Sequence, residues 1–249
     1  MRLDRSLSER LRTGEKLLGT IVSLPSPETA ELLSLCGFDW LFVDLEHGAG
    51  DSLTAQRVLQ AARCPCLVRP QDASDSAIKR VLDIGAAGVI IPGLRSAAEI
   101  EKSIAACRYP PSGTRGVAAA RAHGYGLNFK NYLMDANDEL LVVPQIEHID
   151  AVKDIEAIAT VPGVSALFIG PNDLAASMGY PGHDTHPDVG LAIERVRSVC
   201  VEAGRLLGIF APGPDAAAKW LANGFTLVAV GSDVGMLGQR GRDIVQLLK

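Results

Sequence analysis

Two acidic side chains stand at the ends of neighbouring strand-like segments, where parallel strands commonly bring reactive groups together. Gln145 and Glu147 close one apolar run and, being two residues apart, share one face of a strand. The next apolar run leads into a Gly-Pro-Asn-Asp turn that carries Asp173. Alone, either acid also suits a rim ion pair or a helix cap. Together they predict a site for a hard divalent cation, with the first amides of the following helix suited to an anion beside it.

Strand-like runs alternate with segments of helical spacing along the chain, which implies a parallel sheet. The eight strand-like runs are 18–23, 40–45, 66–69, 88–92, 140–146, 166–170, 207–211 and 226–231. Helical segments between them include 27–35, 53–62, 76–84, 97–108 and 187–203. This alternation predicts an α/β fold, a closed (β/α)8 barrel, with residues 1–249 forming a single domain.

Two regions depart from this alternation. Residues 2–16 have the pattern of an amphipathic helix before the first strand, which would cover the base of the barrel. Residues 109–137 exceed an ordinary connection between a strand and a helix, and long loops of this kind are often functional. They contain a glycine-rich stretch, Arg121 to Gly126, and we expect its His123 to contact the far end of a substrate.

Acids, one histidine and one arginine converge on the end of the predicted barrel where strands finish. The second run ends in Asp44-Leu45-Glu46-His47, and the third ends in Arg69. None of the seven lysines stands at a strand end, whereas a Schiff-base enzyme requires a lysine in its site. This pattern indicates metal-assisted carbonyl chemistry instead.

His47, Arg69 and Asp83 each have two possible interpretations. His47 suits a general base, although a lone histidine is more often structural. Arg69 could neutralise the acids around it or bind a carboxylate or enolate through its planar guanidinium group. Asp83 lies among apolar residues in a helical segment, where it serves either as polarity at the helix end or as a group that orients His47.

Composition excludes several classes of protein. A net charge of −5 and the absence of a basic run argue against a general nucleic-acid surface. The first residues lack the apolar core of a secretory signal, and the longest apolar run, 84–94, is too short to span a bilayer. The five cysteines have no zinc-like spacing. We therefore expect a cytoplasmic protein with reduced thiols and no membrane partner.

Several motifs occur in order across nearly the whole chain. They are Phe38-Asp39-Trp40, Val43 to His47, Val68-Arg69-Pro70, Arg108 to Gly116, Gln145-Ile146-Glu147, Gly170 to Leu174 and Val228 to Asp233. In this combination the chain resembles the HpcH/HpaI aldolases, which include 4-hydroxy-2-oxoheptanedioate and 2-dehydro-3-deoxyglucarate aldolases. The resemblance implies a (β/α)8 barrel of the pyruvate/phosphoenolpyruvate superfamily. It also implies a homohexamer, arranged as a trimer of dimers with helix exchange between subunits.

The resemblance further implies a class II aldolase that depends on Mg²⁺, Mn²⁺ or Co²⁺. Matched by motif, the metal ligands would be Glu147 and Asp173. The catalytic residues would be His47 in the base system, Asp83 as its partner, and Arg69 on the keto oxygen of pyruvate. The enzyme would make or cleave 4-hydroxy-2-oxo acids from a pyruvate or hydroxypyruvate enolate and an aldehyde.

The implied substrate-binding residues are Arg69, Gln145, Asn172 and Asp173, the last two through their amides to the substrate carboxylate. Asn172 departs from the small residue, Ala or Ser, of the family pattern, which matters little if only its amide is used. The stretch from Arg121 to Gly126 also differs, which leaves the aldehyde open.

Two other functions compete with this one. Val43-Asp44-Leu45-Glu46 also resembles CoA-ester lyases of the citrate-lyase β-subunit type, but such an enzyme needs a long basic surface for CoA that the sequence does not show. A non-catalytic protein that binds 2-oxo acids would fit the same barrel. Loss of the base or of a metal ligand would favour it, and the chain retains these residues.

Overall fold

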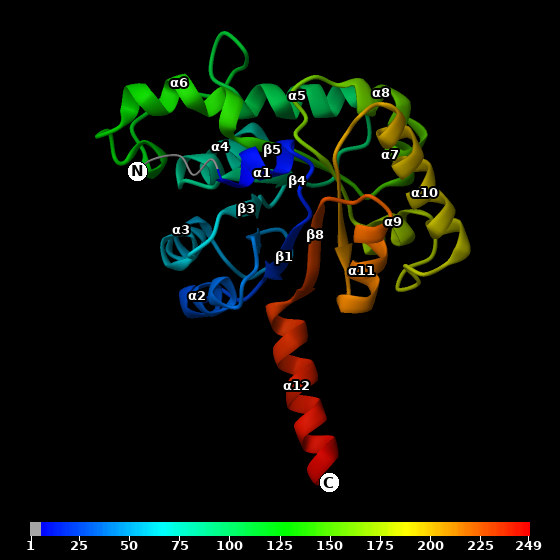
Figure 1. Ribbon diagram of the computed structural model, residues 1–249. Coiled ribbons are helices and arrows are strands. Elements are labelled where there is room, and N and C mark those ends of the chain that lie inside the picture. Colours follow the sequence, from blue (N-terminus) through cyan, green and yellow to red (C-terminus); the bar gives the residue numbers. More distant parts are fainter. Residues whose placement is uncertain (1–5) are drawn as a thin grey trace.

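The computed structural model describes residues 6–249, and eight parallel strands form a closed barrel in chain order (Figure 1). The strands are β1 (Leu17–Val22), β2 (Trp40–Asp44), β3 (Cys66–Arg69), β4 (Gly88–Ile91), β5 (Leu141–Ile146), β6 (Leu167–Ile169), β7 (Leu207–Ala211) and β8 (Leu227–Ser232). All eight predicted strands are present, and the (β/α)8 barrel is confirmed.

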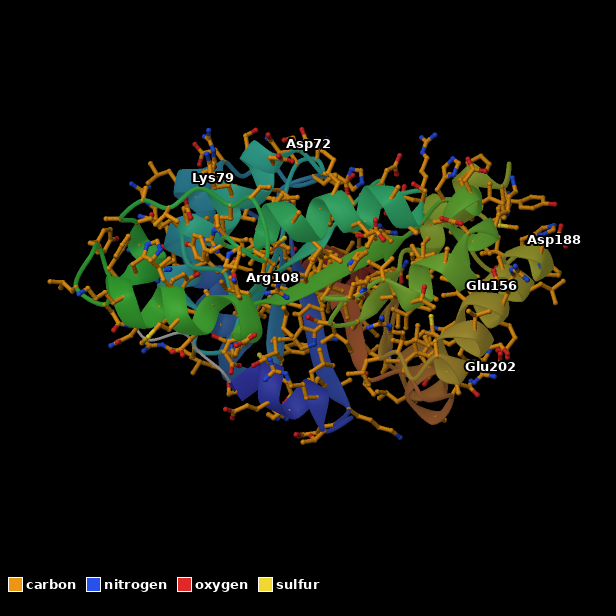
Figure 2. All side chains as sticks on the ribbon, turned by 90° about the horizontal axis from the view of Figure 1, so that it is seen from above. Asp72, Lys79, Arg108, Glu156, Asp188 and Glu202 are labelled. Carbon is orange, nitrogen blue, oxygen red and sulfur yellow. The ribbon has the colours of Figure 1, made fainter. Side chains whose placement is uncertain are left out.

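Helices surround the strands and connect each to the next. They are α1 (Ser6–Arg12), α2 (Pro27–Leu35), α3 (Ser52–Ala61), α4 (Asp75–Asp83), α5 (Ala97–Cys107), α6 (Phe129–Glu139), α7 (Ile149–Lys153), α8 (Ile155–Thr160), α9 (Pro171–Ser177), α10 (Pro187–Glu202), α11 (Pro214–Ala222) and α12 (Asp233–Leu248). A 3₁₀ turn, Arg121–His123, lies between α5 and α6. Seen from above, Arg108 lies toward the interior, whereas Glu156 and Glu202 lie at the periphery on α8 and α10 (Figure 2).

Apolar side chains fill two layers. One lies between the strands and the surrounding helices, and the other fills the inside of the barrel. Trp40, Phe42 and Phe168 form the aromatic centre of the inner layer, with ring centroids 5.6–6.4 Å apart. Leu7 and Leu11 of α1 are buried in the same inner layer. Helix α1 therefore covers the base of the barrel, as predicted. Of the predicted helical segment 2–16, residues 6–12 are helical, residues 13–16 are not, and residues 1–5 lie outside the described part.

The strand register places the polar residues of the rim side by side. Asp44 at the end of β2 pairs with Arg69 at the end of β3. Gln145 of β5 pairs with Phe168 of β6. Because all strands run in the same direction, Asp44, Arg69 and Gln145 face one end of the barrel, and the aromatic centre that includes Phe168 lies beneath them.

Helix α12 differs from the other helices because it extends away from the barrel and carries the C-terminus with it (Figure 1). Seven of the 17 large apolar side chains that are exposed in the described residues lie on it. They are Val234, Met236, Leu237, Ile244, Val245, Leu247 and Leu248. No helix within residues 6–249 has the length and apolar character that crossing a membrane requires.

Candidate active site

The C-terminal ends of the strands enclose a cavity of about 140 Å³. Its walls combine aromatic side chains from inside the barrel with polar groups of the rim. It is lined by Ile21, Phe42, His47, Arg69, Gln145, Phe168, Gly170, Pro171, Asn172, Asp173 and Phe210. Five of the seven predicted site residues therefore line one cavity, and Glu147 joins them through its hydrogen bond with Gln145.

Arg69 is the rigid positive charge of this cavity. Its Nε and Nη2 atoms donate to the two carboxylate oxygens of Asp44, at 2.9 and 2.7 Å, and both side chains are buried. The guanidinium group lies over the ring of Phe42, 5.1 Å from its centroid. Burial alone would raise the pKa of Asp44, but the hydrogen bonds and charge of Arg69 outweigh it and hold that pKa below its ordinary value. This paired geometry fixes the arginine and leaves Nη1 toward Gln145, whose Oε1 is 3.4 Å away.

Glu147 is a buried carboxyl group in a strongly negative setting. Burial raises its pKa to about 7, and the nearby charges of Glu46 and Asp173 act in the same direction. The amide of Gly93 opposes this by donating to one oxygen at 2.6 Å, and Gln145 donates to the other through Nε2. The charge of Arg69 also opposes the rise, but burial outweighs the two donors and this charge, so the pKa of Glu147 stays raised.

Asp173 reaches the same cavity from the first turn of α9. Helix α9 begins at Pro171, which suits the first position of a helix because its missing N–H would be unpaired there in any case. The amides of Asn172 and Asp173 belong to this first turn, where N–H groups have no partner within the helix. Gly170 permits the close approach of these elements, since a Cβ there would meet Gln145 Nε2 at 2.6 Å.

His47 lies at the mouth of the cavity with 62% of its side chain exposed. Its amide lies 3.4 Å from an oxygen of Asp44, which also accepts from the amide of Glu46. The imidazole Nε2 lies 3.7 Å from Glu46 Oε2. The chain thus turns sharply over Asp44 and points the histidine toward the cavity.

The donor set of the cavity fits a divalent cation with several exchangeable positions. Within residues 6–249, no three side chains of His, Cys, Asp or Glu form a preformed metal cluster. Glu147 and Asp173 nevertheless supply two carboxylates at one rim, and the raised pKa of Glu147 marks a carboxylate that a positive charge would stabilise. Such a site suits Mg²⁺ or Mn²⁺, which commonly bind through one or two carboxylates and take their other ligands from water and substrate.

Within one chain the structure does not bring Asp83 and His47 together, and the role of Asp83 as the partner of His47 stays a prediction. Asp83 is the last residue of α4, which starts at the rim after β3 and runs back to the base where β4 begins. There its carboxylate accepts a hydrogen bond from Arg115 at 2.7 Å. The guanidinium group of Arg115 is buried and stacks over Tyr109, 4.5 Å from the ring centroid. Asp83 therefore compensates a buried charge at the opposite end of the barrel from His47.

The glycine-rich stretch also lies at the base and not at the cavity. Arg121 donates to the carbonyl oxygen of Ile84, just after α4, at 2.6 Å. His123 is fully buried, and its Nε2 lies 3.0 Å from the hydroxyl of Tyr109. Within one chain His123 therefore lies away from the cavity, and its contact with a substrate stays a prediction.

Two residues of the site, Asp44 and Glu46, have roles that the sequence motifs do not reveal. Asp44 holds Arg69, and Glu46 Oε2 lies 3.1 Å from Arg69 Nη1. Asp44 ends a strand three residues before the proposed base, but its pairing with Arg69 depends on the register between β2 and β3.

The comparisons with known proteins agree with this arrangement. The model of a family described as HpcH/HpaI aldolase/citrate lyase matches residues 18–239. A 4-hydroxy-2-oxovalerate aldolase from Rhodococcus jostii is 40% identical over 94% of this chain and 92% of its own length. A hydroxypyruvate/pyruvate aldolase from Pseudomonas aeruginosa is 38% identical over 97% and 91%. Among solved structures, an HpcH/HpaI aldolase/citrate lyase family protein from Burkholderia cenocepacia has a TM-score of 0.94 at 36% identity, covering 98% of this chain and 99% of that one.

A more distant structure bears on the competing function. The citrate lyase β subunit of M. tuberculosis has a TM-score of 0.59 at 16% identity, covering 89% of this chain and 93% of that one, so the likeness extends to the fold alone. The two aldolases and the Burkholderia cenocepacia structure are instead 36–40% identical to this chain. Sequence, barrel and rim geometry together place the chain in the HpcH/HpaI aldolase/citrate lyase family.

Proposed function

We propose that this protein is a divalent-cation-dependent aldolase, a carbon–carbon lyase that makes or cleaves 4-hydroxy-2-oxo acids. The donor would be pyruvate or hydroxypyruvate, and the acceptor an aldehyde. The observation that carries the proposal is the buried Arg69, locked by Asp44, in one cavity with Asp173, while the buried Glu147 contacts Gln145 of the cavity wall. The names of the related aldolases support this reading.

In this proposal Glu147 and Asp173 would hold the cation, Mg²⁺, Mn²⁺ or Co²⁺, which supplies Lewis-acid stabilisation of the negative charge that develops on the 2-oxo acid. Arg69 would donate to the keto oxygen as it gains charge, and its bidentate pairing with Asp44 means that it needs little reorganisation to do so. The amides of Asn172 and Asp173 would bind the substrate carboxylate. Gln145 would orient the substrate between Arg69 and Glu147, both of which it contacts.

His47 would transfer the protons. In the direction of synthesis it would remove a proton from C3 of pyruvate, and in cleavage it would accept the proton of the 4-hydroxyl group. Its exposure at the mouth of the cavity suits a group that exchanges protons with solvent. Within the described residues no lysine lines the cavity, so the chain's own groups favour an enolate over an imine.

The assembly and location belong to the same proposal. We propose a homohexamer, a trimer of dimers, of a cytoplasmic protein whose single domain spans the whole chain. The apolar side chains of α12 support an assembly, because seven of them are exposed on a helix that leaves the barrel.

Exchange of the pyruvate methyl protons tests the proposal without knowledge of the aldehyde. In D₂O with Mg²⁺ or Mn²⁺, the protein should remove the methyl signal of pyruvate in proton NMR, and EDTA should stop the loss. The variants His47→Ala and Glu147→Gln should be deficient, and Glu156→Gln, an exposed carboxylate on α8, serves as the matched control. Absence of exchange from the folded wild-type protein with either metal would refute a pyruvate aldolase. Once exchange is observed, a panel of aldehydes would identify the acceptor.

A further inference from the structure

Glu46 is a partly buried carboxylate to which the proposed mechanism assigns no role. Its Oε2 atom is buried and has no hydrogen-bond donor, although the described residues surround it closely. Arg69 Nη1 lies 3.1 Å from this oxygen, but the pair lacks the geometry of a hydrogen bond. A buried acceptor without a donor is costly, because it has lost its hydrogen bonds to water and no protein group replaces them. The position of Glu46 therefore calls for a donor that can come close to Oε2.

The imidazole of His47 is such a donor. Its Nε2 atom lies 3.7 Å from the same oxygen, just beyond hydrogen-bond distance. The histidine side chain is largely exposed, so it can rotate with little obstruction. Within residues 6–249, Glu46 provides the carboxylate of the only ion pair of His47. A small rotation of the ring would satisfy Oε2 and fix the imidazole at once.

The charges around Glu46 favour a hydrogen-bond donor such as the imidazole of His47 beside its carboxylate. Burial raises its pKa, and the carboxylates of Asp44 and Asp173 act in the same direction, while Arg69 and His47 oppose it. Arg69 is already committed to Asp44 by two hydrogen bonds. Its charge stabilises Glu46 without satisfying Oε2, which leaves the imidazole as the available partner.

We propose that Glu46 is a positioning residue for His47, with Oε2 accepting a hydrogen bond from imidazole Nε2–H. This bond would place the proton on Nε2 and leave the lone pair on Nδ1, so that Nδ1 faces the reacting carbon or hydroxyl group. Arg69 would link both parts of the site, because its charge lies 3.1 Å from the Glu46 carboxylate and its guanidinium group would donate to the keto oxygen. The inference rests on the proposed aldolase function.

The test compares Glu46→Ala, Glu46→Gln, His47→Ala and the double variant Glu46→Ala/His47→Ala with the wild-type protein. Glu156→Ala removes an exposed carboxylate as the control. Pyruvate methyl exchange in D₂O gives kcat and KM, and electron paramagnetic resonance of free Mn²⁺ gives the affinity for the cation. Circular dichroism verifies that each variant is folded.

Loss of the acceptor should lower kcat for exchange about 10- to 100-fold in Glu46→Ala, because misplacement of a catalytic group by about 1 Å has effects of this size. KM for pyruvate and the Kd for Mn²⁺ should change less than about threefold. Glu46→Gln retains an acceptor oxygen and should recover much of the lost rate. The double variant should be no slower than His47→Ala, since a positioning residue has no effect once its target is gone.

Three results would overturn the inference while the proposed function stands. They are a rate within twofold of wild type in Glu46→Ala, losses that multiply in the double variant, and a loss of rate matched by an equal loss of Mn²⁺ affinity. The last result would assign Glu46 to the cation site instead. No exchange in the wild-type protein would refute both the inference and the function on which it rests.

Discussion

Replacing Glu147 with glutamine should remove a pH dependence of folding that the wild-type protein has in the absence of divalent metal. In the unfolded chain this carboxyl group ionises around its ordinary pKa of 4.5, whereas in the folded chain it stays protonated up to about pH 7. Between these values the unfolded chain has lost a proton that the folded chain retains. The free energy of unfolding therefore falls as the pH rises, and this contribution levels off above pH 7.

The pKa difference sets the size of the effect. The two values differ by 2.5 (7 − 4.5), which at about 1.36 kcal/mol per pKa unit corresponds to about 3.4 kcal/mol in total. About 2.5 kcal/mol of this falls between pH 5 and pH 8, because the titration of the unfolded chain has already begun at pH 5. Between pH 5 and pH 8, the free energy of unfolding of the wild-type protein should therefore fall by this amount more than that of Glu147→Gln.

Urea unfolding followed by circular dichroism, in EDTA at pH 5 and pH 8, measures the difference. Glu156→Gln, which removes an exposed carboxylate, should follow the wild-type protein. Added Mg²⁺ at about 100 times its Kd should return about 2.7 kcal/mol to the wild-type protein at pH 8 and little to Glu147→Gln. Equal pH dependence in wild type and Glu147→Gln would refute the reasoning about the buried carboxylate, and equal stabilisation by Mg²⁺ would refute its role as a cation ligand.

Three further substitutions probe other parts of the structure. Gly170→Ala places a Cβ 2.6 Å from Gln145 Nε2, so pyruvate exchange should fall at least about tenfold; an unchanged exchange rate in D₂O would contradict the packing at the cavity wall. Asp83→Asn leaves the buried Arg115 without its charge partner and should reduce the free energy of unfolding by about 3 kcal/mol. Urea unfolding measures this loss, and a change below about 1 kcal/mol would argue against the pair. Leu237→Glu, on the exposed face of α12, should reduce the molar mass found by light scattering if α12 is buried between subunits. An unchanged mass would exclude that role for this side chain.

The sequence predicts the barrel well because its strands are buried on both faces and end at turns. The ranges 66–69 and 207–211 match the observed strands β3 and β7. The other strands differ by one or two residues at their ends, where fraying and assignment commonly vary. Helix α12 has no counterpart among the predicted segments, since Gly235, Gly238 and Gly241 weaken its helical pattern.

The site was predictable where it depends on the ends of strands. Arg69 and Gln145 stand on strands, and the direction of a parallel sheet brings their ends together. Asp83 lies away from His47 within one chain because a helix that follows a strand runs back to the base, so nearness to Arg69 in sequence does not mean nearness in space. The locked pair of Asp44 with Arg69 depends on strand register, which no spacing along one chain reveals.

The exposed leucines of α12 also bear on how stable an isolated chain would be. If partner subunits cover this helix, dilution would return its apolar surface to water, and the folded state would become less stable through mass action. The melting temperature of the protein would then rise with protein concentration, although the barrel core itself is complete within one chain. A helix that contributes little to its own barrel would thus link the folding of each chain to the number of its neighbours.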